Sequence, residues 1–302
     1  MAYGWVLYFL NRIEEAHKVV NTLPTKPAGA YEFLGIVYEI QGMFEEAEKC
    51  FVTSLDMYCR ETSQDKRYDY YGQQIKTEVK NRHLDLLLMN PMERPKWVPY
   101  PDPRIIKVLR LLGNMYTKCG MSLEAISHCH KALHLTHDFF GAETVTNELI
   151  GVCNTLSIAY KSNSEPEKAL DYSRQGLSMF RQIYTKPTME YAAMLNNTGY
   201  HCIGLKKHFE AYCYIRQCIG MLKSLSLQDT LHMAHSLDSL GEYYAETCQF
   251  TKSEHTYREA QAIFRNHHPN HTGVDKINRV LSQLRDKQAH ALQFPIRCRY
   301  PI

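Results

Sequence analysis

Histidines gather at one point of this 302-residue chain, where they could bind a metal ion. His128, His130, His134 and His137 surround Cys129 in one short stretch. His130 and His134 stand four residues apart, a spacing that places two imidazoles on one face of a helix and lets them chelate a metal. No HExxH arrangement accompanies them, and an ordinary polar helix surface explains the same residues. We expect the polar surface, with a metal site as the alternative.

Signatures of catalysis are otherwise missing from the sequence. His267, His268 and His271 form a second cluster, which we expect to lie in a polar loop. No phosphate-binding loop, GxSxG elbow or dinucleotide fingerprint occurs. We therefore expect no catalytic residue, no cofactor and no resident metal, and an enzyme is only a third hypothesis.

Composition narrows the class of protein. Apolar residues make up 44% of the chain and aromatic residues 11%, enough to bury a substantial core. The net charge of +3 carries no clustered basic excess of the kind that binds nucleic acid or anionic membranes. No apolar run approaches the roughly 18 to 20 residues that span a bilayer. The apolar stretch Ala2–Leu10 is expected to be a helix, with a signal peptide as the alternative.

The cysteines indicate the compartment. None of the ten forms a CxxC pair, and most fall inside apolar helical patterns. A disulfide framework is more typical of short, loop-rich secreted chains. We therefore expect buried free thiols and a cytoplasmic protein, with a disulfide framework as the alternative.

Small residues reveal an internal repeat. Five segments share a frame in which a Gly or Ser is followed by a second small residue twelve positions on and by a third seven positions further. The first small residues are Gly35, Gly113, Ser157, Gly199 and Gly241; the second are Ala47, Ala125, Ala169, Ala211 and Ser253; the third are Ser54, Ala132, Gly176, Cys218 and Ala260. Two antiparallel helices approach closely only where side chains are small, so each unit is expected to be a pair of helices. Gly42, Gly120 and Asn163 or Ser164 are expected in the turns between paired helices.

These residues resemble the tetratricopeptide repeat, whose first helix carries Leu-Gly/Ala-x-x-Tyr. Leu34-Gly35-x-x-Tyr38 and Leu112-Gly113-x-x-Tyr116 match this pattern, whereas Thr198-Gly199-x-x-Cys202 departs from it. The resemblance covers most of Ala28–Glu61 and Ile106–Asn266. It implies an all-α fold, a right-handed superhelical solenoid of antiparallel helix pairs.

The units are longer than the usual 34 residues of this family. They begin near residues 106, 150, 192 and 234, so that successive starts are 44, 42 and 42 residues apart. This spacing, together with Leu195-Asn196-Asn197, is similar to the kinesin light chain group of tetratricopeptide proteins.

The same frame divides the chain into four parts. Residues 1–61 are expected to hold N-terminal repeats, the first of them truncated or degenerate, with Gly4 and Ala16 at its small positions. Residues 62–104 are expected to be a helical insertion followed by a proline-rich, extended stretch over Asn90–Pro103. Residues 105–266 hold four long repeats, and residues 267–302 a capping helix and a tail. The proline-rich stretch is expected to be a surface connection, with insertion of Trp97 and Tyr100 into the groove as a pseudo-ligand as the alternative.

The resemblance also implies where a partner binds. In the family, the first helix of each repeat (helix A) lines a concave groove, and the residues at its groove positions form the candidate peptide-binding site. We select Lys107, Arg110, Asn114, Asn154, Lys161, Asn196 and Tyr200. Asn side chains can hold the backbone of an extended peptide, and Lys and Arg can select carboxylates. Ala193 and Asn197 stand where the chaperone-adaptor members need Lys and Arg, so we do not expect the carboxylate clamp of those members.

The sequence therefore predicts a non-catalytic scaffold or adaptor that binds another protein. Its partner is expected to be an extended peptide of acidic or mixed charge, with no role for nucleic acid or membrane. A detached regulatory or sensor segment of a larger multidomain protein is the alternative.

Overall fold

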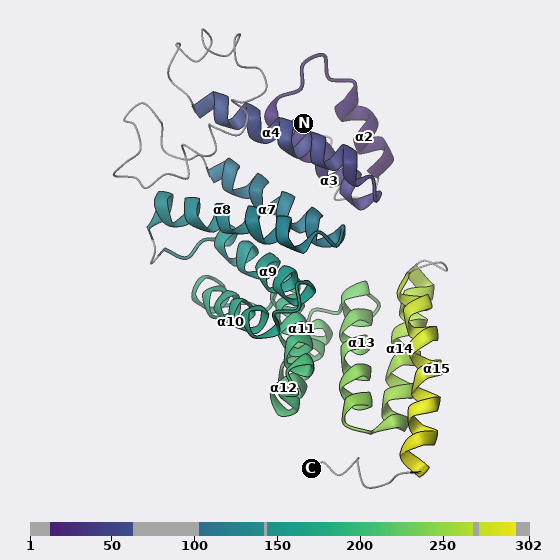
Figure 1. Cartoon of the computed structure of the whole chain (residues 1–302). Coiled ribbons are helices and arrows are strands. Elements are labelled where there is room, and N and C mark those ends of the chain that lie inside the picture. The colour runs from purple at the N-terminus through teal and green to yellow at the C-terminus, as the bar shows by residue number, and fades with distance from the viewer. Residues whose placement is uncertain (1–12, 63–102, 142–143, 268–271, 294–302) are drawn as a thin grey trace. The chain divides into compact units, whose positions relative to one another are not determined.

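The structure is a computed structural model that describes residues 13–62, 103–141, 144–267 and 272–293 (Figure 1). All regular elements in these ranges are α-helices, which confirms the predicted fold class. The chain divides into two compact units, Met1–Asn163 and Ser164–Ile302, each described below by itself. No helix in the described ranges combines the length and apolarity needed to cross a membrane.

Unit 1 is a stack of helix pairs. Its helices are α2 (Ile13–Asn21), α3 (Ala28–Ile40), α4 (Phe44–Thr62), α7 (Pro103–Lys118), α8 (Ser122–Phe140) and α9 (Asn147–Ser162). Helix α3 packs on α4, and α7 packs on α8; α4 contacts α7, and α9 contacts both α7 and α8. Ala16 of α2, a predicted small position, is completely buried against α3.

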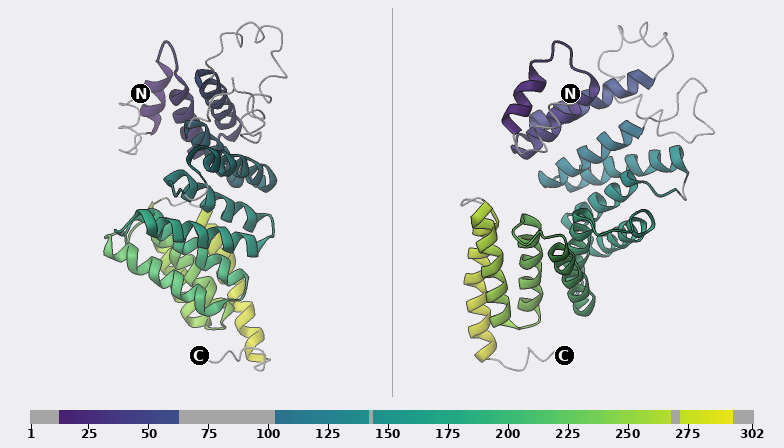
Figure 2. Two further views of the ribbon diagram at one scale, coloured as in Figure 1. Left: turned by 90° about the vertical axis from the view of Figure 1, so that its left-hand side faces the viewer. Right: turned by 180° about the vertical axis from the view of Figure 1, so that it is seen from behind.

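Unit 2 repeats the arrangement. Its helices are α10 (Pro166–Ile183), α11 (Met189–Gly204), α12 (His208–Ser224), α13 (Leu231–Glu246), α14 (Phe250–His267) and α15 (Thr272–Gln293). Helices α11 and α12 form one pair, α13 and α14 form the next, and α15 packs on α14 (Figure 2). Buried Val274 and Ile277 of α15 join Tyr257 and Phe264 of α14 in one apolar cluster, so α15 covers the last pair as predicted.

Close helix crossings explain the small residues. A Cβ atom added to Gly35 would lie 2.6 Å from the Phe51 ring, and one added to Gly199 would lie 2.6 Å from Cγ1 of Ile215. Both distances are too short for real Cβ contacts, so the bulky side chain of one helix occupies the place that glycine leaves open on its partner.

The turns inside the pairs share one backbone conformation. Gly42 and Gly120 have φ of 75° and 77°, and Ser164, Lys206 and Cys248 have φ of 61°, 58° and 59° at the equivalent place. Glycine adopts this left-handed region without steric cost, whereas other residues pay for it. The predicted turn positions are therefore correct, and the non-glycine turns show that packing of the paired helices outweighs the local preference.

Threonines begin three successive A helices at the same register. The side chains of Thr146, Thr188 and Thr230 accept hydrogen bonds from the backbone N–H groups of Leu149, Tyr191 and Met233. Such caps satisfy donors that the first helical turn leaves without partners.

One predicted boundary is wrong. Pro103, expected at the end of an extended stretch, is the first residue of α7, because proline fits the first helical turn where no N–H partner is needed. Helix α15 of the C-terminal part continues to Gln293. The predictions for Gly4, for the insertion and for Trp97 and Tyr100 fall outside the described residues.

Candidate functional site

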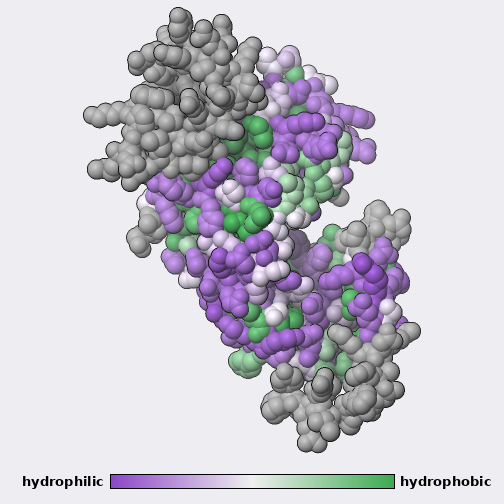
Figure 3. All heavy atoms as spheres, in the orientation of Figure 1, coloured by the Kyte–Doolittle hydropathy of each residue, from purple (hydrophilic) through white to green (hydrophobic). Residues whose placement is uncertain are grey.

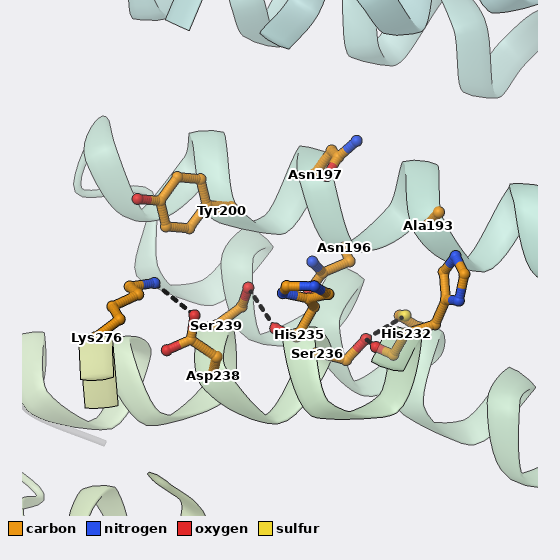
Figure 4. Close-up of a pocket in the computed structure, with 11 residues that line it drawn as sticks. Ala193, Asn196, Asn197, Tyr200, His232, His235, Ser236, Asp238, Ser239 and Lys276 are labelled. Carbon is orange, nitrogen blue, oxygen red and sulfur yellow. Dashed lines mark hydrogen bonds and ion pairs between the residues drawn. The ribbon is translucent and has the colours of Figure 1, made fainter. Parts of the chain in front are cut away.

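A pocket of about 340 Å³ lies within unit 2, between helices α11 and α13 (Figure 4). Its walls come from α11, α12, α13 and α15. They are Ala193, Asn196, Asn197, Tyr200, Cys218, His232, His235, Ser236, Asp238, Ser239 and Lys276. The volume is within the range of about 300 to 1,000 Å³ typical of ligand sites.

An ion pair closes one end of the pocket. The ammonium of Lys276 lies 2.5 Å from Oδ2 of Asp238, and Asp238 is only 8% exposed. Burial by itself lowers the pKa of Lys276, but the carboxylate of Asp238 and its hydrogen bond, with smaller contributions from Tyr200 and Glu242, raise it overall. Lys276 therefore stays charged at neutral pH and holds α15 against α13.

Two oxygen atoms in the pocket wall lack hydrogen-bond partners. Oδ1 of Asp238 and Oδ1 of Asn196 are both buried, and neither accepts a hydrogen bond within the described structure. A buried acceptor without a partner costs about 1–3 kcal/mol, so such atoms are rare unless a bound group satisfies them. In Figure 4 the two side chains come from helices α11 and α13, which face each other across the pocket.

The remaining polar groups of the wall are oriented by the protein itself. The hydroxyls of Ser236 and Ser239 donate to the backbone carbonyls of His232 and His235, 2.8 and 3.1 Å away. Burial lowers the pKa of His232, and the opposing effect of Glu190 is smaller. The lowered pKa favours the neutral imidazole. The hydroxyl protons of Ser236 and Ser239 are therefore directed to the α13 backbone and not into the pocket.

In unit 1, three predicted site residues on α7 lie against carboxylates. The ammonium of Lys107 lies 2.5 Å from Glu32 of α3. Nε of Arg110 lies 2.8 Å from Glu148 of α9. The charges that were predicted to select an acidic peptide are thus already matched inside the unit.

Glu39 of α3 completes this arrangement. It is 6% exposed and accepts a hydrogen bond from Asn114 at 2.8 Å and one from Lys118 at 2.7 Å, both at Oε1. Asn154 and Lys161 lie half-buried on α9 of the same unit. The structure therefore places five of the seven predicted residues in unit 1 and brings Asn196 and Tyr200 together at the pocket of unit 2.

Comparisons with known proteins agree with this architecture. No protein-family model matches the chain, and no curated protein matches it as a relative. Solved structures do match: BtubC (BKLC) from P. vanneervenii superposes with a TM-score of 0.55 at 17% identity, over 83% of this chain and 86% of that chain. TPR-like repeats of kinesin light chain type from Podosopora anserina superpose with a TM-score of 0.52 at 12% identity, over 79% and 95%.

The fold is that of tetratricopeptide repeats. Within this tetratricopeptide fold, helices α7, α9, α11 and α13 are the A helices that the resemblance selected as groove-lining. At this level of identity the likeness concerns the fold, so the chemistry of the site depends on the side chains described above.

Sequence reasoning missed several residues that the tetratricopeptide fold makes important. Glu32 and Glu39 occupy the same helix-A positions as Arg110 and Thr117, so the rule that selected Arg110 would also have found them in the N-terminal repeat. Lys276, which sequence reasoning did not single out, reaches the pocket from α15. No local sequence pattern indicates this position of Lys276, because its partner Asp238 is 38 residues away.

Half of the histidine cluster lies on the polar surface that was expected: His134 and His137 are exposed, whereas His128 and His130 pack between helices. His128 stacks on Tyr116 with ring centroids 5.3 Å apart, and its Nδ1 is buried without a hydrogen-bond partner. His130 lies 2.8 Å from the hydroxyl of Tyr160 on α9. These two histidines pack between helices because the B helix has neighbours on more than one side. No group of three or more potential metal ligands occurs among the described residues.

The described cysteines are free. Burial raises the pKa of Cys129 and Cys153 to about 12 and of Cys202 and Cys218 to about 11, because the thiolate loses its hydration. The prediction of buried free thiols is confirmed for these residues. Cys213 differs, since it lies exposed on α12.

Proposed function

We propose that the chain is a non-catalytic scaffold that binds an extended segment of another protein along its A helices, with the pocket between α11 and α13 as a main contact. One observation carries the proposal. The wall of this pocket holds two buried oxygen atoms that the described structure leaves without donors, on Asn196 and Asp238. A peptide has backbone and side-chain N–H groups that supply such donors.

Charge pairing favours a partner segment of mixed charge. An acidic peptide would have to compete with Glu32 for Lys107 and with Glu148 for Arg110. Both ion pairs are partly buried, and a new carboxylate would have to replace a partner that is already in place, so these cations are poor sites for it. Lys161 and Asn154 remain candidates for contacts to the peptide in unit 1.

The face of the molecule shown in Figure 3 favours recognition by polar groups. On the face shown in Figure 3, apolar residues of the described ranges form small separate patches among polar ones. Recognition by polar groups of an extended peptide suits such a surface better than burial of one large apolar area. The free thiols fit a reducing compartment, so we place this function in the cytoplasm.

A matched pair of tyrosine substitutions tests the proposal. Tyr200→Ala removes a wall of the pocket, whereas Tyr212→Ala removes an exposed tyrosine from α12 of the same unit. Peptides selected from a randomised display library on the full chain should lose at least about tenfold in affinity for Tyr200→Ala and retain their affinity for Tyr212→Ala. Equal binding by both variants, with circular dichroism unchanged, would refute the proposed site.

Unit 1 needs a separate test in which its ion pairs are preserved. Arg110→Glu alone would place two carboxylates together, so it is combined with Glu148→Arg, which keeps the pair in reversed order. Together with Lys161→Glu, this swap should weaken peptide binding and reduce its salt dependence if α7 and α9 contact the peptide. Unchanged affinity would confine the site to unit 2.

A further inference from the structure

The pocket between α11 and α13 has the chemistry of a receptor for a single cationic side chain. We propose that it holds one arginine side chain of the bound segment, with the guanidinium between the Tyr200 ring and the unpaired oxygens of Asn196 and Asp238. This inference rests on the proposed function for the origin of the arginine, and it names what the pocket selects.

The unpaired atoms determine the kind of ligand group. Oδ1 of Asn196 and Oδ1 of Asp238 are acceptors, so the group that completes them must donate. The two residues come from different helices that face each other across the pocket (Figure 4). A guanidinium carries five N–H donors in a rigid planar fork and can reach two separated acceptors at once, which one ammonium does less well.

The local charges favour a cation. Asp238 is an acidic residue of which only Oδ2 is engaged by Lys276. Glu242 is a second acidic residue near enough to raise the pKa of Lys276. A ligand cation can therefore approach the free oxygen of Asp238 without displacing Lys276.

The shape of the pocket agrees with this ligand. Tyr200 forms one wall, and the face of an aromatic ring attracts a guanidinium placed over it. Ser239 points its proton toward the α13 backbone, so its oxygen offers a further acceptor to a planar donor, whereas the oxygen of Ser236 already lies 3.1 Å from the Cys218 sulfur. A volume of about 340 Å³ leaves room for one long side chain.

Ethylguanidinium tests the pocket independently of any peptide. Its dissociation constant for the full chain is measured by saturation-transfer NMR, with ethylurea as a neutral probe of similar shape. We expect Asp238→Asn to weaken ethylguanidinium roughly tenfold to a hundredfold, and Asn196→Ala to weaken it as well. Asp171→Asn, the same change at an exposed position on α10, should have no effect. Equal binding of ethylurea, or equal loss in Asp171→Asn, overturns the proposal.

Selected peptides then separate this inference from the proposed function. The expected result is an arginine at one position of the peptides selected by the full chain, lost when selection uses Asp238→Asn. Peptides that require Tyr200 but show no arginine, or accept lysine equally, leave the scaffold function standing and overturn the arginine assignment. If no peptide is selected while ethylguanidinium binds through Asp238, the pocket chemistry holds and the scaffold function fails.

Discussion

The ammonium of Lys107 on α7 lies 2.5 Å from the carboxylate of Glu32 on α3, and only 6% of the Glu32 side chain is exposed. Residues 41–102, which include α4, separate these two helices in the sequence. The ion pair, together with Glu39 and its partners Asn114 and Lys118, therefore fixes how α7 lies against the N-terminal repeat. These residues of α7 therefore contribute to the cohesion of unit 1.

Removing the cation of this pair should destabilise unit 1. Lys107→Met leaves Glu32 buried without its partner, and we expect the free energy of unfolding to fall by about 1–3 kcal/mol, measured by urea denaturation. The double variant Glu32→Gln/Lys107→Met should recover most of this loss because no buried charge remains. Arg60→Met, which breaks the exposed pair with Asp56, should cost less than about 1 kcal/mol. Equal costs for the two single variants would contradict a cohesive role for Glu32.

The close crossing of α13 and α14 should not tolerate a side chain. A Cβ atom on Gly241 would lie 2.8 Å from the Tyr257 ring, whereas nothing lies within 4 Å of one on Gly220. Gly241→Val should therefore lower the free energy of unfolding by roughly 1–3 kcal/mol through overpacking. Gly220→Val serves as the control in the same unit and should be neutral or slightly stabilising, because glycine is a poor helix former. A similar midpoint of thermal unfolding for both variants would show that the crossing relaxes freely.

Protonation of His128 should reduce stability at mildly acidic pH. Burial, with a smaller effect of Lys131, lowers its pKa to about 4, against opposing effects of Glu48 and Glu124. A histidine in the unfolded chain has a pKa near 6.5, so between about pH 6.5 and 4 the unfolded chain binds a proton at His128 that the folded chain does not bind. The contribution of neutral His128 to the free energy of unfolding is therefore complete above pH 6.5 and is lost as the pH falls toward 4.

The corresponding measurement compares two pH profiles. Between pH 7 and pH 5 the native chain should lose about 1–2 kcal/mol more of its unfolding free energy than His128→Gln, which cannot titrate. His255→Gln, at an exposed site on α14, should leave the profile unchanged. Parallel profiles for the native chain and His128→Gln would show that His128 is accessible to protons in the folded state.

Thiol reactivity should distinguish one cysteine from the buried set. Cys213 is exposed, whereas Cys129, Cys153 and Cys218 are buried thiols with raised pKa values. With a thiol-specific disulfide reagent at pH 8, Cys213 should react at least about a hundredfold faster than these three. Mass spectrometry of peptides locates the modified residue, and Cys213→Ser should remove its share of the fast phase. Fast modification of Cys129 in the folded chain would contradict the packing at Gly113, where a Cβ atom would meet its sulfur at 2.4 Å.

Much of the fold was predictable because each repeat is specified by residue patterns that are local in the sequence. Gly35 and Gly199 allow the close approach of a neighbouring helix, and Gly42 and Gly120 adopt the left-handed conformation of a turn. These constraints act within one helix pair and recur along the chain. The boundary at Pro103 was less predictable, since proline is equally at home in an extended stretch and in a first helical turn.

The sequence by itself determined the all-α repeat fold, the pairing of helices, the position of the turns and the free thiols. Only the tertiary structure decided which polar residues are available for a partner. Lys107 and Arg110 face carboxylates from other helices, while Asp238 keeps one buried oxygen unpaired beside Lys276. The reason is physical. Helix periodicity assigns a residue to one face of its helix. Whether its charge is paired depends on side chains that lie tens of residues away in the chain.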